Sequence, residues 1–400
     1  MSKSFLTKPK GFRVAAVKAG IKSSGKLDLG LIVADQPCTA AATFTKNKIV
    51  GPSVVINREK IKSGRARAVF VNAGNANTCT GKRGERDVHT ICREVGKSLA
   101  MDSNDILVCS TGIIGEFLPM DKVRQGIEKA AASLSRTAQA DQNLARAILT
   151  TDLCSKTAQQ KIAIGNRTAS IAGIAKGSGM IAPNMATMLA FLTTDVNISA
   201  ALLRRALKKQ VERSFNKVSV DNHMSTSDTV ILLASGQAHN KQITKADSNY
   251  SKFEKALGLV CDNLARQIAA DGEGATCMVT VRVQGAANNQ DAYAAVRKIV
   301  ESPLVRCAFN GADPNWGRIV SAVGYSGTKF NVHKLSCKIA GVPVFRAGKP
   351  CRFNAQALSL KMKAKQWDVV VDLGVGRCKD FCYTCDLSRG YVRINADYHT

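Results

Sequence analysis

The sequence predicts an α/β protein built in layers, and three observations support this class. Short apolar runs bounded by turn residues, typical of strands, alternate along the chain with longer amphipathic segments, typical of helices. Hydrophobic residues make up 45% of the 400 residues and charged residues 22%, which is ordinary for a folded protein long enough for two or three domains. Aromatic residues make up only 5%, while glycine and alanine are abundant, which favours closely packed layers.

Apolar or alternating runs between turn signals predict the strands. These runs are Val54–Asn57, Ala68–Val71, Ile106–Cys109, Lys161–Ile164, Met188–Leu192, Val230–Ala234, Met278–Val283, Val369–Leu373 and Tyr391–Ile394. Apolar stripes at helical spacing predict helices at Val123–Leu134, Leu203–Val211, Phe253–Ile268 and Ala292–Val300. Ser199 is expected as the N-cap of the second helix, and the glycines of Asp271–Gly274 end the third.

A polar segment, Gly285–Asp291, predicts the domain boundary. On this basis residues 1–285 form the larger domain, and residues 286–400 form a smaller C-terminal α/β domain. No internal repeat is visible in the sequence.

The net charge is +27, which by itself is typical of a nucleic-acid-binding protein. The excess is spread along the chain, without a run of five or more like charges and without an RNA-binding or zinc-finger motif. We therefore expect a solvated basic surface and no nucleic-acid partner. No stretch has the roughly 18 apolar residues that a membrane span needs, and the first residues lack a secretory h-region, so a cytoplasmic protein without a membrane partner is expected.

Thirteen cysteines are scattered along the chain, and an odd, scattered set argues against a disulfide framework. Cys378, Cys382 and Cys385 form a C-x3-C-x2-C cluster in which His399 is the only nearby candidate for a fourth ligand. A structural zinc site needs four ligands, commonly from two such pairs. We therefore expect reduced thiols and no metal.

The segment Lys176–Asp195 (KGSGMIAPNMATMLAFLTTD) carries the most chemical information. A glycine-rich turn and a Pro-Asn turn precede Ala186 and Thr187, and an apolar strand follows them. A threonine in this position has the layout of an N-terminal nucleophile: its hydroxyl attacks the preceding carbonyl, and the released α-amine then acts as its base. None of the five histidines lies beside a candidate serine or cysteine nucleophile. A threonine at the head of a strand is nevertheless usually an ordinary strand residue, so the spacing leaves both interpretations open.

In addition to the segment above, long motifs occur in order over nearly the whole chain: Pro9–Phe12, Val71–Gly81, Ser110–Glu116, Leu149–Asp152, Val220–Thr229, Asp271–Thr276, Gly311–Gly327 and Ile394–Thr400. Together these motifs resemble the ornithine acetyltransferase (glutamate N-acetyltransferase) family of arginine biosynthesis. The resemblance implies a layered sandwich like that of the N-terminal-nucleophile hydrolases, with a smaller C-terminal domain whose tail returns to the active site. The chain departs from the family's pattern at Asn222-His223-Met224, and we assign His223 no role.

The resemblance also implies roles for individual residues. Cleavage between Ala186 and Thr187 would make Thr187 the nucleophile, and Thr111 with Gly112 would form the oxyanion hole. Such a hole needs donors aimed at the developing negative charge. Substrate contacts are implied at Thr150, Lys176, Thr187, Glu273, Asn395 and Thr400.

The implied reaction is a ping-pong transfer of acetyl from N2-acetylornithine to glutamate, without a metal or organic cofactor. Some family members also accept acetyl-CoA as donor, and the sequence does not decide whether this chain does. The implied assembly has two α chains (residues 1–186) and two β chains (residues 187–400). Two rival interpretations are an autoprocessed aminopeptidase, which passes the acyl group to water, and a basic nucleic-acid-binding protein, whose chain remains whole.

Overall fold

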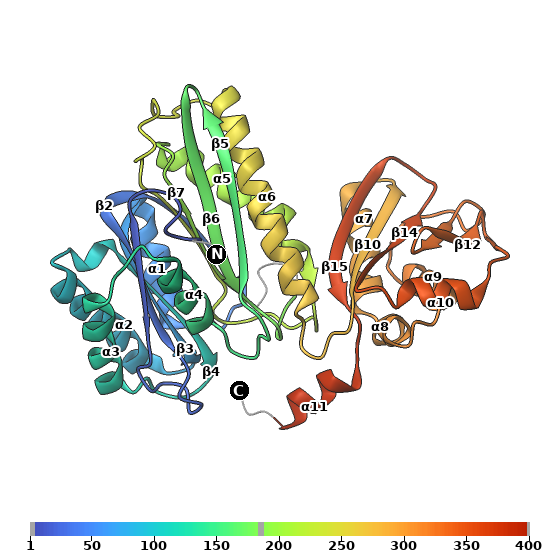
Figure 1. Ribbon diagram of the computed structural model, residues 1–400. Helices are drawn as coiled ribbons and strands as arrows, with labels where there is room; N and C mark the ends of the chain where they lie inside the picture. The colour runs from blue at the N-terminus through green and yellow to red at the C-terminus, as the bar shows by residue number, and fades with distance from the viewer. Residues whose placement is uncertain (1–4, 183–187, 398–400) are drawn as a thin grey trace. The chain divides into compact units, whose positions relative to one another are not determined.

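The computed structural model describes residues 5–182 and 188–397, which form two compact units (Figure 1). Among these residues, the first unit comprises 5–182, 188–216 and 223–268, and the second comprises 217–222 and 269–397. None of the described helices is long and apolar enough to cross a membrane.

The first unit is built on an eight-stranded mixed sheet. Its order is β4-β3-β2-β9-β7-β6-β5, and β1 also pairs with β2. The strands are β1 Phe12–Val17, β2 Leu29–Phe44, β3 Arg65–Asn75, β4 Ile106–Ile113, β5 Lys156–Ile164, β6 Arg167–Lys176, β7 Leu189–Thr194 and β9 Thr229–Ala234. The pairs β3–β4 and β7–β9 are parallel, and the remaining pairs are antiparallel.

Helices and apolar residues cover both faces of this sheet. The helices are α1 Pro52–Lys60, α2 Gly81–Leu99, α3 Met120–Ala132, α4 Ala138–Ala147, α5 Ala200–Arg213 and α6 Ser248–Ala270. Along β2, Leu31 and Val33 join one buried cluster with α2 and α3, while Ile32 joins a second cluster with α4. This alternation follows from the two-residue period of a strand, and it places one core on each face. Figure 1 shows α6 lying along β5 and β6.

The expected strand at Val54–Asn57 is wrong, because these residues lie inside α1. Pro52 occupies the first turn of the helix, where its missing N–H costs nothing, and Gly51 precedes it as the N-cap. Val54 and Asn57, three residues apart, are buried on one face. The side chain of Asn57 donates to the carbonyl of Val108 at 2.7 Å and accepts from the Val108 amide at 3.0 Å.

The second unit contains a seven-stranded sheet in the order β13-β12-β11-β14-β10-β15-β8. Its strands are β8 Val218–Ser219, β10 Met278–Ala286, β11 Ser336–Ile339, β12 Val342–Arg346, β13 Lys349–Pro350, β14 Gln366–Asp372 and β15 Cys378–Cys385. Its helices are α7 Asn289–Glu301, α8 Pro303–Asn310, α9 Trp316–Gly324, α10 Ala355–Met362 and α11 Arg389–Asp397. One apolar cluster fills this unit, with Val281, Ile299 and Val369 among its fully buried members.

The expected strand at Tyr391–Ile394 is also wrong, since these residues belong to α11. The hydroxyl of Ser388 accepts the Tyr391 amide at 3.3 Å, which is the contact of a helix N-cap. The side chain of Asn395 donates to the carbonyl of Tyr391, four residues earlier, at 3.0 Å. The other expected strands and helices are present, with ends that differ by a few residues.

The division into units differs from the boundary expected at Gly285–Asp291. The second unit takes in the chain from residue 269, because β10 pairs with β14 on one side and with β15 on the other. Residues 217–222 join it as well, since β8 pairs with β15. The polar segment follows β10 and leads into α7.

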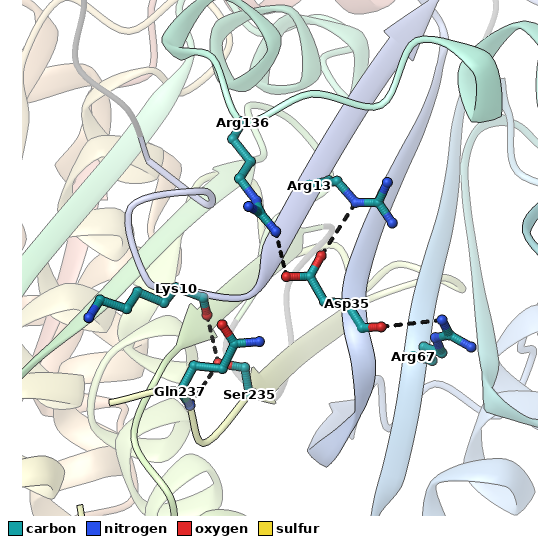
Figure 2. A network of polar contacts seen from close by, with 7 residues as sticks. All are labelled: Lys10, Arg13, Asp35, Arg67, Arg136, Ser235 and Gln237. Atoms are coloured by element: carbon teal, nitrogen blue, oxygen red, sulfur yellow. Dashed lines mark hydrogen bonds and ion pairs between the residues drawn. The ribbon is translucent and has the colours of Figure 1, made fainter. Parts of the chain in front are cut away.

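Part of the positive charge of the first unit surrounds a single carboxylate, that of Asp35, in the irregular part of β2 (Figure 2). Arg136 donates to Oδ2 of Asp35 at 2.5 Å, Arg13 lies 3.4 Å from Oδ1, and Arg67 donates to the backbone carbonyl at 3.2 Å. Figure 2 also shows Ser235, which donates to the carbonyl of Lys10 at 2.6 Å. Two arginines therefore contact the carboxylate of Asp35 and a third contacts its main-chain carbonyl, so these cations lie in a network rather than in a linear basic motif.

Candidate active site

Thr111 and Gly112 lie at the end of β4, where that strand meets a bulge in β3. Thr111 is buried, and Gly112 has a φ of +134°. A Cβ on Gly112 would lie 2.3 Å from the carbonyl carbon of Gly74 and 2.5 Å from the nitrogen of Asn75. Only glycine fits this approach of two main chains, so the backbone of the predicted oxyanion segment is held against β3.

Thr150 belongs to a turn that is organised by the carboxylate of Asp152. Oδ2 accepts the amide of Thr150 at 3.1 Å, while Oδ1 accepts the amide of Gly177 and the ammonium of Lys156, each at 2.6 Å. The side chains of Asp152 and Lys156 are fully buried. Burial alone would raise the pKa of Asp152, but the charges of Lys176 and Lys156 outweigh it and hold the pKa at about 2.

Lys176 is the last residue of β6, and its exposed fraction is only 2%. In the antiparallel pairing of β6 with β7 it lies opposite Leu189, two residues after the predicted nucleophile. The predicted role of Lys176 near Thr187 is therefore compatible with the register of the sheet. A buried ammonium of this kind suits the carboxylate of a substrate.

A second lysine, Lys22, connects the Gly112 region with the Lys176 region. Its Nζ donates to the carbonyls of Leu27 at 2.8 Å and Ala147 at 3.0 Å, and its Cγ packs against Gly74, which Gly112 also contacts. Burial lowers the pKa of Lys22 to about 8; the charge of Lys176 acts in the same direction. Thr111, Gly112, Thr150 and Lys176 are thus brought into one region of the first unit.

The start of β7 is fixed on both sides of Met188. The Met188 amide donates to Oδ1 of Asp228 at 2.9 Å, and the Met188 carbonyl accepts the amide of Thr229 at 3.1 Å. Asp228 is 1% exposed, and burial raises its pKa well above the ordinary value. The predicted cleavage residues Ala186 and Thr187 lie outside the described residues, so the described chain resumes one residue after the nucleophile.

In the second unit, Glu273 and Asn395 are in contact. The Asn395 side chain donates to Oε2 of Glu273 at 2.8 Å, and Glu273 is 7% exposed. The turn that carries Glu273 is held to the start of α11 by Ser388, whose hydroxyl donates to the carbonyl of Gly274 at 2.5 Å. Thr400, the last predicted substrate contact, lies outside the described residues.

Sequence reasoning missed Asp152, Lys156, Lys22 and Asp228 as members of the site. Asp152 and Asp228 stand inside motifs that carried the resemblance, at the ends of Leu149–Asp152 and near the end of Val220–Thr229. Their partners lie far along the chain: 25 residues separate Asp152 from Gly177, and 40 separate Asp228 from Met188. The one local signal was the four-residue spacing of Asp152 and Lys156.

The cysteine cluster of the second unit lies on β15, where Cys378 and Cys382 share one face and Cys385 lies on the other. The three thiols therefore do not converge. Within residues 5–182 and 188–397, no three side chains of His, Cys, Asp or Glu gather closely enough to hold a metal ion.

Comparison with known proteins gives the same family along nearly the whole chain. The model of the ArgJ family matches residues 13–400. The arginine biosynthesis bifunctional protein ArgJ of Symbiobacterium thermophilum is 43% identical over 397 residues, which are 99% of this chain and 98% of that protein. The protein of the same name from Rhodopirellula baltica is 44% identical over 395 residues, covering 98% of this chain and 96% of that protein.

A solved structure also matches this chain. The crystal structure of arginine biosynthesis bifunctional protein ArgJ from Bacillus halodurans has 41% sequence identity and a TM-score of 0.51. The match covers 98% of that chain and 52% of this one. The layered α/β class and the ornithine acetyltransferase type of fold are therefore confirmed, and this chain belongs to the ArgJ family.

Proposed function

We propose that this enzyme of the ArgJ family acts in arginine biosynthesis by moving an acetyl group from N2-acetylornithine to glutamate through an ester on Thr187. The relatives that match the whole chain are named for arginine biosynthesis. The observation that carries the proposal is the buried Lys176, set opposite Leu189 beside the strand that follows Thr187. Lys22, Lys156 and Lys176 gather around the buried carboxylate of Asp152, and the charges of Lys176 and Lys156 lower its pKa. The ammonium of Lys176 suits the carboxylate of an amino-acid substrate.

The nucleophile is made by self-cleavage. The Thr187 hydroxyl attacks the carbonyl carbon of Ala186, the peptide bond shifts to an ester, and water hydrolyses that ester. The freed α-amine, whose ordinary pKa is about 7.7–8.0, then accepts the proton of the Thr187 hydroxyl. The Bacillus halodurans chain supports a cut near the middle, since it is matched over 98% of its own length yet spans 52% of this chain.

Transfer then takes two steps. The Thr187 oxygen attacks the acetyl carbonyl of N2-acetylornithine, and ornithine leaves with the proton that the α-amine had taken. The amine of glutamate next attacks the acetyl ester, giving N-acetylglutamate and restoring the Thr187 hydroxyl. Thr111 and Gly112 stabilise the oxyanion of each step, and Lys176 with Thr150 holds the substrate. Glu273 and Asn395 receive the cationic amine of ornithine, and Thr400 completes the substrate contacts.

Acetyl-CoA is a second candidate donor for the same ester. Incubating the purified enzyme with acetyl-CoA and glutamate, and looking for N-acetylglutamate, decides whether it is used.

We further propose an assembly of two α and two β chains, and a place in the cytoplasm. The thirteen cysteines are free thiols in the structure, which fits a reducing compartment.

Variants of Thr187 test the proposal. Denatured wild-type protein is expected to run as two bands instead of one at 42.7 kDa, and N-terminal sequencing of the second band should begin at Thr187. Thr187→Ala should give one uncut band and no transfer, while Thr187→Ser keeps a hydroxyl and part of both activities. Hydrolysis of N2-acetylornithine at a rate independent of glutamate would favour the aminopeptidase instead. A whole wild-type chain that binds DNA or RNA with a steep salt dependence would favour the nucleic-acid-binding protein.

A further inference from the structure

The buried carboxyl group of Asp228 accepts a hydrogen bond from the main chain immediately after the predicted cleavage site. Its Oδ1 accepts the Met188 amide at 2.9 Å, and its side chain is almost completely buried. The nitrogen of Met188 is bonded to the carbonyl carbon of Thr187. The contact therefore holds one end of the nucleophile's own peptide unit.

This contact continues the ladder between β7 and β9 with a side chain. The parallel pairing begins with Leu189 opposite Thr229, so Met188 lies one residue before the ladder. On the carbonyl side Met188 accepts the amide of Thr229, as a strand residue would. On the amide side the partner is the carboxyl group of Asp228. Both main-chain groups of Met188 are thereby fixed.

Asp228 is itself held in place by β2. The amide of Thr45, the residue after β2, donates to the carbonyl of Asp228 at 2.9 Å. The hydroxyl of Thr45 donates to the carbonyl of Ser225 at 2.7 Å, so the segment that leads to Asp228 is held as well. These two bonds fix the main chain that carries Asp228, and the burial of its side chain restricts the positions that the carboxyl group can take.

The surroundings of Asp228 favour a neutral carboxyl group. Its side chain is 1% exposed, and burial raises the pKa of Asp228 well above the ordinary value. The Met188 amide, the charge of Lys176 and the side chains of Thr45 and Ser225 act in the opposite direction without outweighing the burial. A neutral carboxyl has one carbonyl acceptor and one O–H donor, which makes asparagine a close copy of it.

We propose that Asp228 is a positioning residue for Thr187, and that the hydrogen bond it accepts from the Met188 amide positions the nucleophile for both self-cleavage and acetyl transfer. The inference rests on the proposed function, because it needs Thr187 as the nucleophile. It assigns Asp228 no proton transfer and no contact with substrate. A displaced nucleophile explains a large loss of rate, since an error of about 1 Å can cost about a hundredfold.

The test compares two substitutions of Asp228 during synthesis of the full chain in a cell-free translation system. Asp228→Asn keeps an oxygen that accepts the Met188 amide, and it should be cut at nearly the wild-type rate. Asp228→Ala removes the acceptor, and its cleavage should slow about a hundredfold. The rate is followed as conversion of the 42.7 kDa band into two smaller bands, and folding is checked by thermal melting of the purified protein. Where the alanine variant fails to fold, Asp228→Leu fills the same volume without an acceptor and gives the same comparison.

Asp141 supplies a matched control in the first unit. It too is a buried acid that accepts main-chain amides, from Phe5 at 2.7 Å and Thr7 at 3.2 Å, and burial raises its pKa. Asp141→Ala should lower the melting temperature and leave the cleavage rate of the folded protein unchanged. A wild-type chain that stays whole refutes the proposed function itself. Wild-type cleavage with equally fast cleavage of Asp228→Ala overturns the positioning role alone. Asp228→Asn as slow as Asp228→Ala also overturns it, because a charge or proton would then be required.

Discussion

At the scale of single residues, Gly112 occupies a place that no other amino acid can take. We expect Gly112→Ala to abolish acetyl transfer, because its Cβ would lie 2.3 Å from the main chain of Gly74 and the φ of +134° disfavours a side chain. Transfer assays and thermal melting measure the two losses.

Gly115→Ala is the control for the conformational cost alone. Gly115 also has a positive φ, of +89°, but nothing lies within 4 Å of a Cβ placed there. It should lose about 1–2 kcal/mol of stability and keep most of its transfer activity. Equal activity of the two alanine variants would show that the contact between Gly112 and β3 has no part in the reaction.

The buried pair of Asp152 and Lys156 predicts a dependence of stability on pH. Asp152→Asn should cost about 3–5 kcal/mol at pH 7, because it leaves the buried ammonium of Lys156 without its carboxylate. The folded-state pKa of Asp152 is about 2, below the unfolded value of about 3.9, so the stability it provides is present above pH 4 and is lost as the pH falls towards 2.

The wild-type advantage over Asp152→Asn should therefore shrink by about 1 kcal/mol between pH 5 and pH 3. Denaturant unfolding at both pH values measures it. Adding Lys156→Met to Asp152→Asn removes the buried ammonium that has lost its carboxylate, and should restore part of the stability. A constant difference between pH 5 and pH 3 would mean that Asp152 does not titrate as the structure implies.

The residues of the site were only partly predictable from the sequence. Lys176 and Glu273 stand in motifs with a recognisable chemistry, and the structure shows both to be buried. Asp152 and Asp228 stand in motifs too, but their hydrogen-bond partners Gly177 and Met188 lie 25 and 40 residues away. Local patterns contain no information on such pairs, because the pairing is decided by the register of the sheet.

At the scale of elements, the limits of local sequence patterns also explain the two wrong strand predictions. Val54–Asn57 and Tyr391–Ile394 are short apolar stretches, and periodicity over four residues does not separate a strand from a buried turn of helix. Pro52 and Ser388 were the deciding signals, as a first-turn proline and a capping hydroxyl. Longer stripes such as Phe253–Ile268 were predicted well, because several turns of helix repeat the same face.

Helix α11 gives a prediction at this scale. Asn395→Ala removes the hydrogen bond from α11 to Glu273, and hydrogen bonds to charged groups contribute about 1.5–3 kcal/mol. We expect the KM for N2-acetylornithine to rise at least about tenfold with little change in kcat, because the proposed role of this contact is in substrate binding and not at the reacting bond.

Steady-state kinetics measure both parameters for Asn395→Ala. Arg393→Ala on the same helix is the control, since Arg393 is largely exposed and lies beside Asp397, four residues on, rather than beside Glu273. It should leave the KM unchanged. A fall in kcat with an unchanged KM in Asn395→Ala would contradict a binding role.

At the scale of the whole molecule, the predicted cut does not separate the two pieces. The second piece supplies β9 and β7, which lie in the middle of the first sheet between β2 and β6 of the first piece. Six residue pairs join β2 to β9, and six join β6 to β7. Releasing either piece would break the sheet in two places.

We therefore expect the cleaved protein to elute as one species in size-exclusion chromatography without denaturant. The two pieces should part only in concentrated guanidinium chloride, where the circular dichroism of the sheet is lost. Separate elution of the pieces in native buffer would contradict the interleaved sheet.

The side chain of Asn57 affects how separate copies of the protein can associate. Strand β4 ends the order of the first sheet, and a terminal strand offers its main chain to any other polypeptide that arrives. By supplying both an acceptor and a donor to Val108, the Asn57 amide imitates the neighbouring strand that β4 lacks. This contact blocks the addition of another strand at the middle of the β4 edge. The Asn57→Ala variant should therefore be more prone to aggregate through that edge.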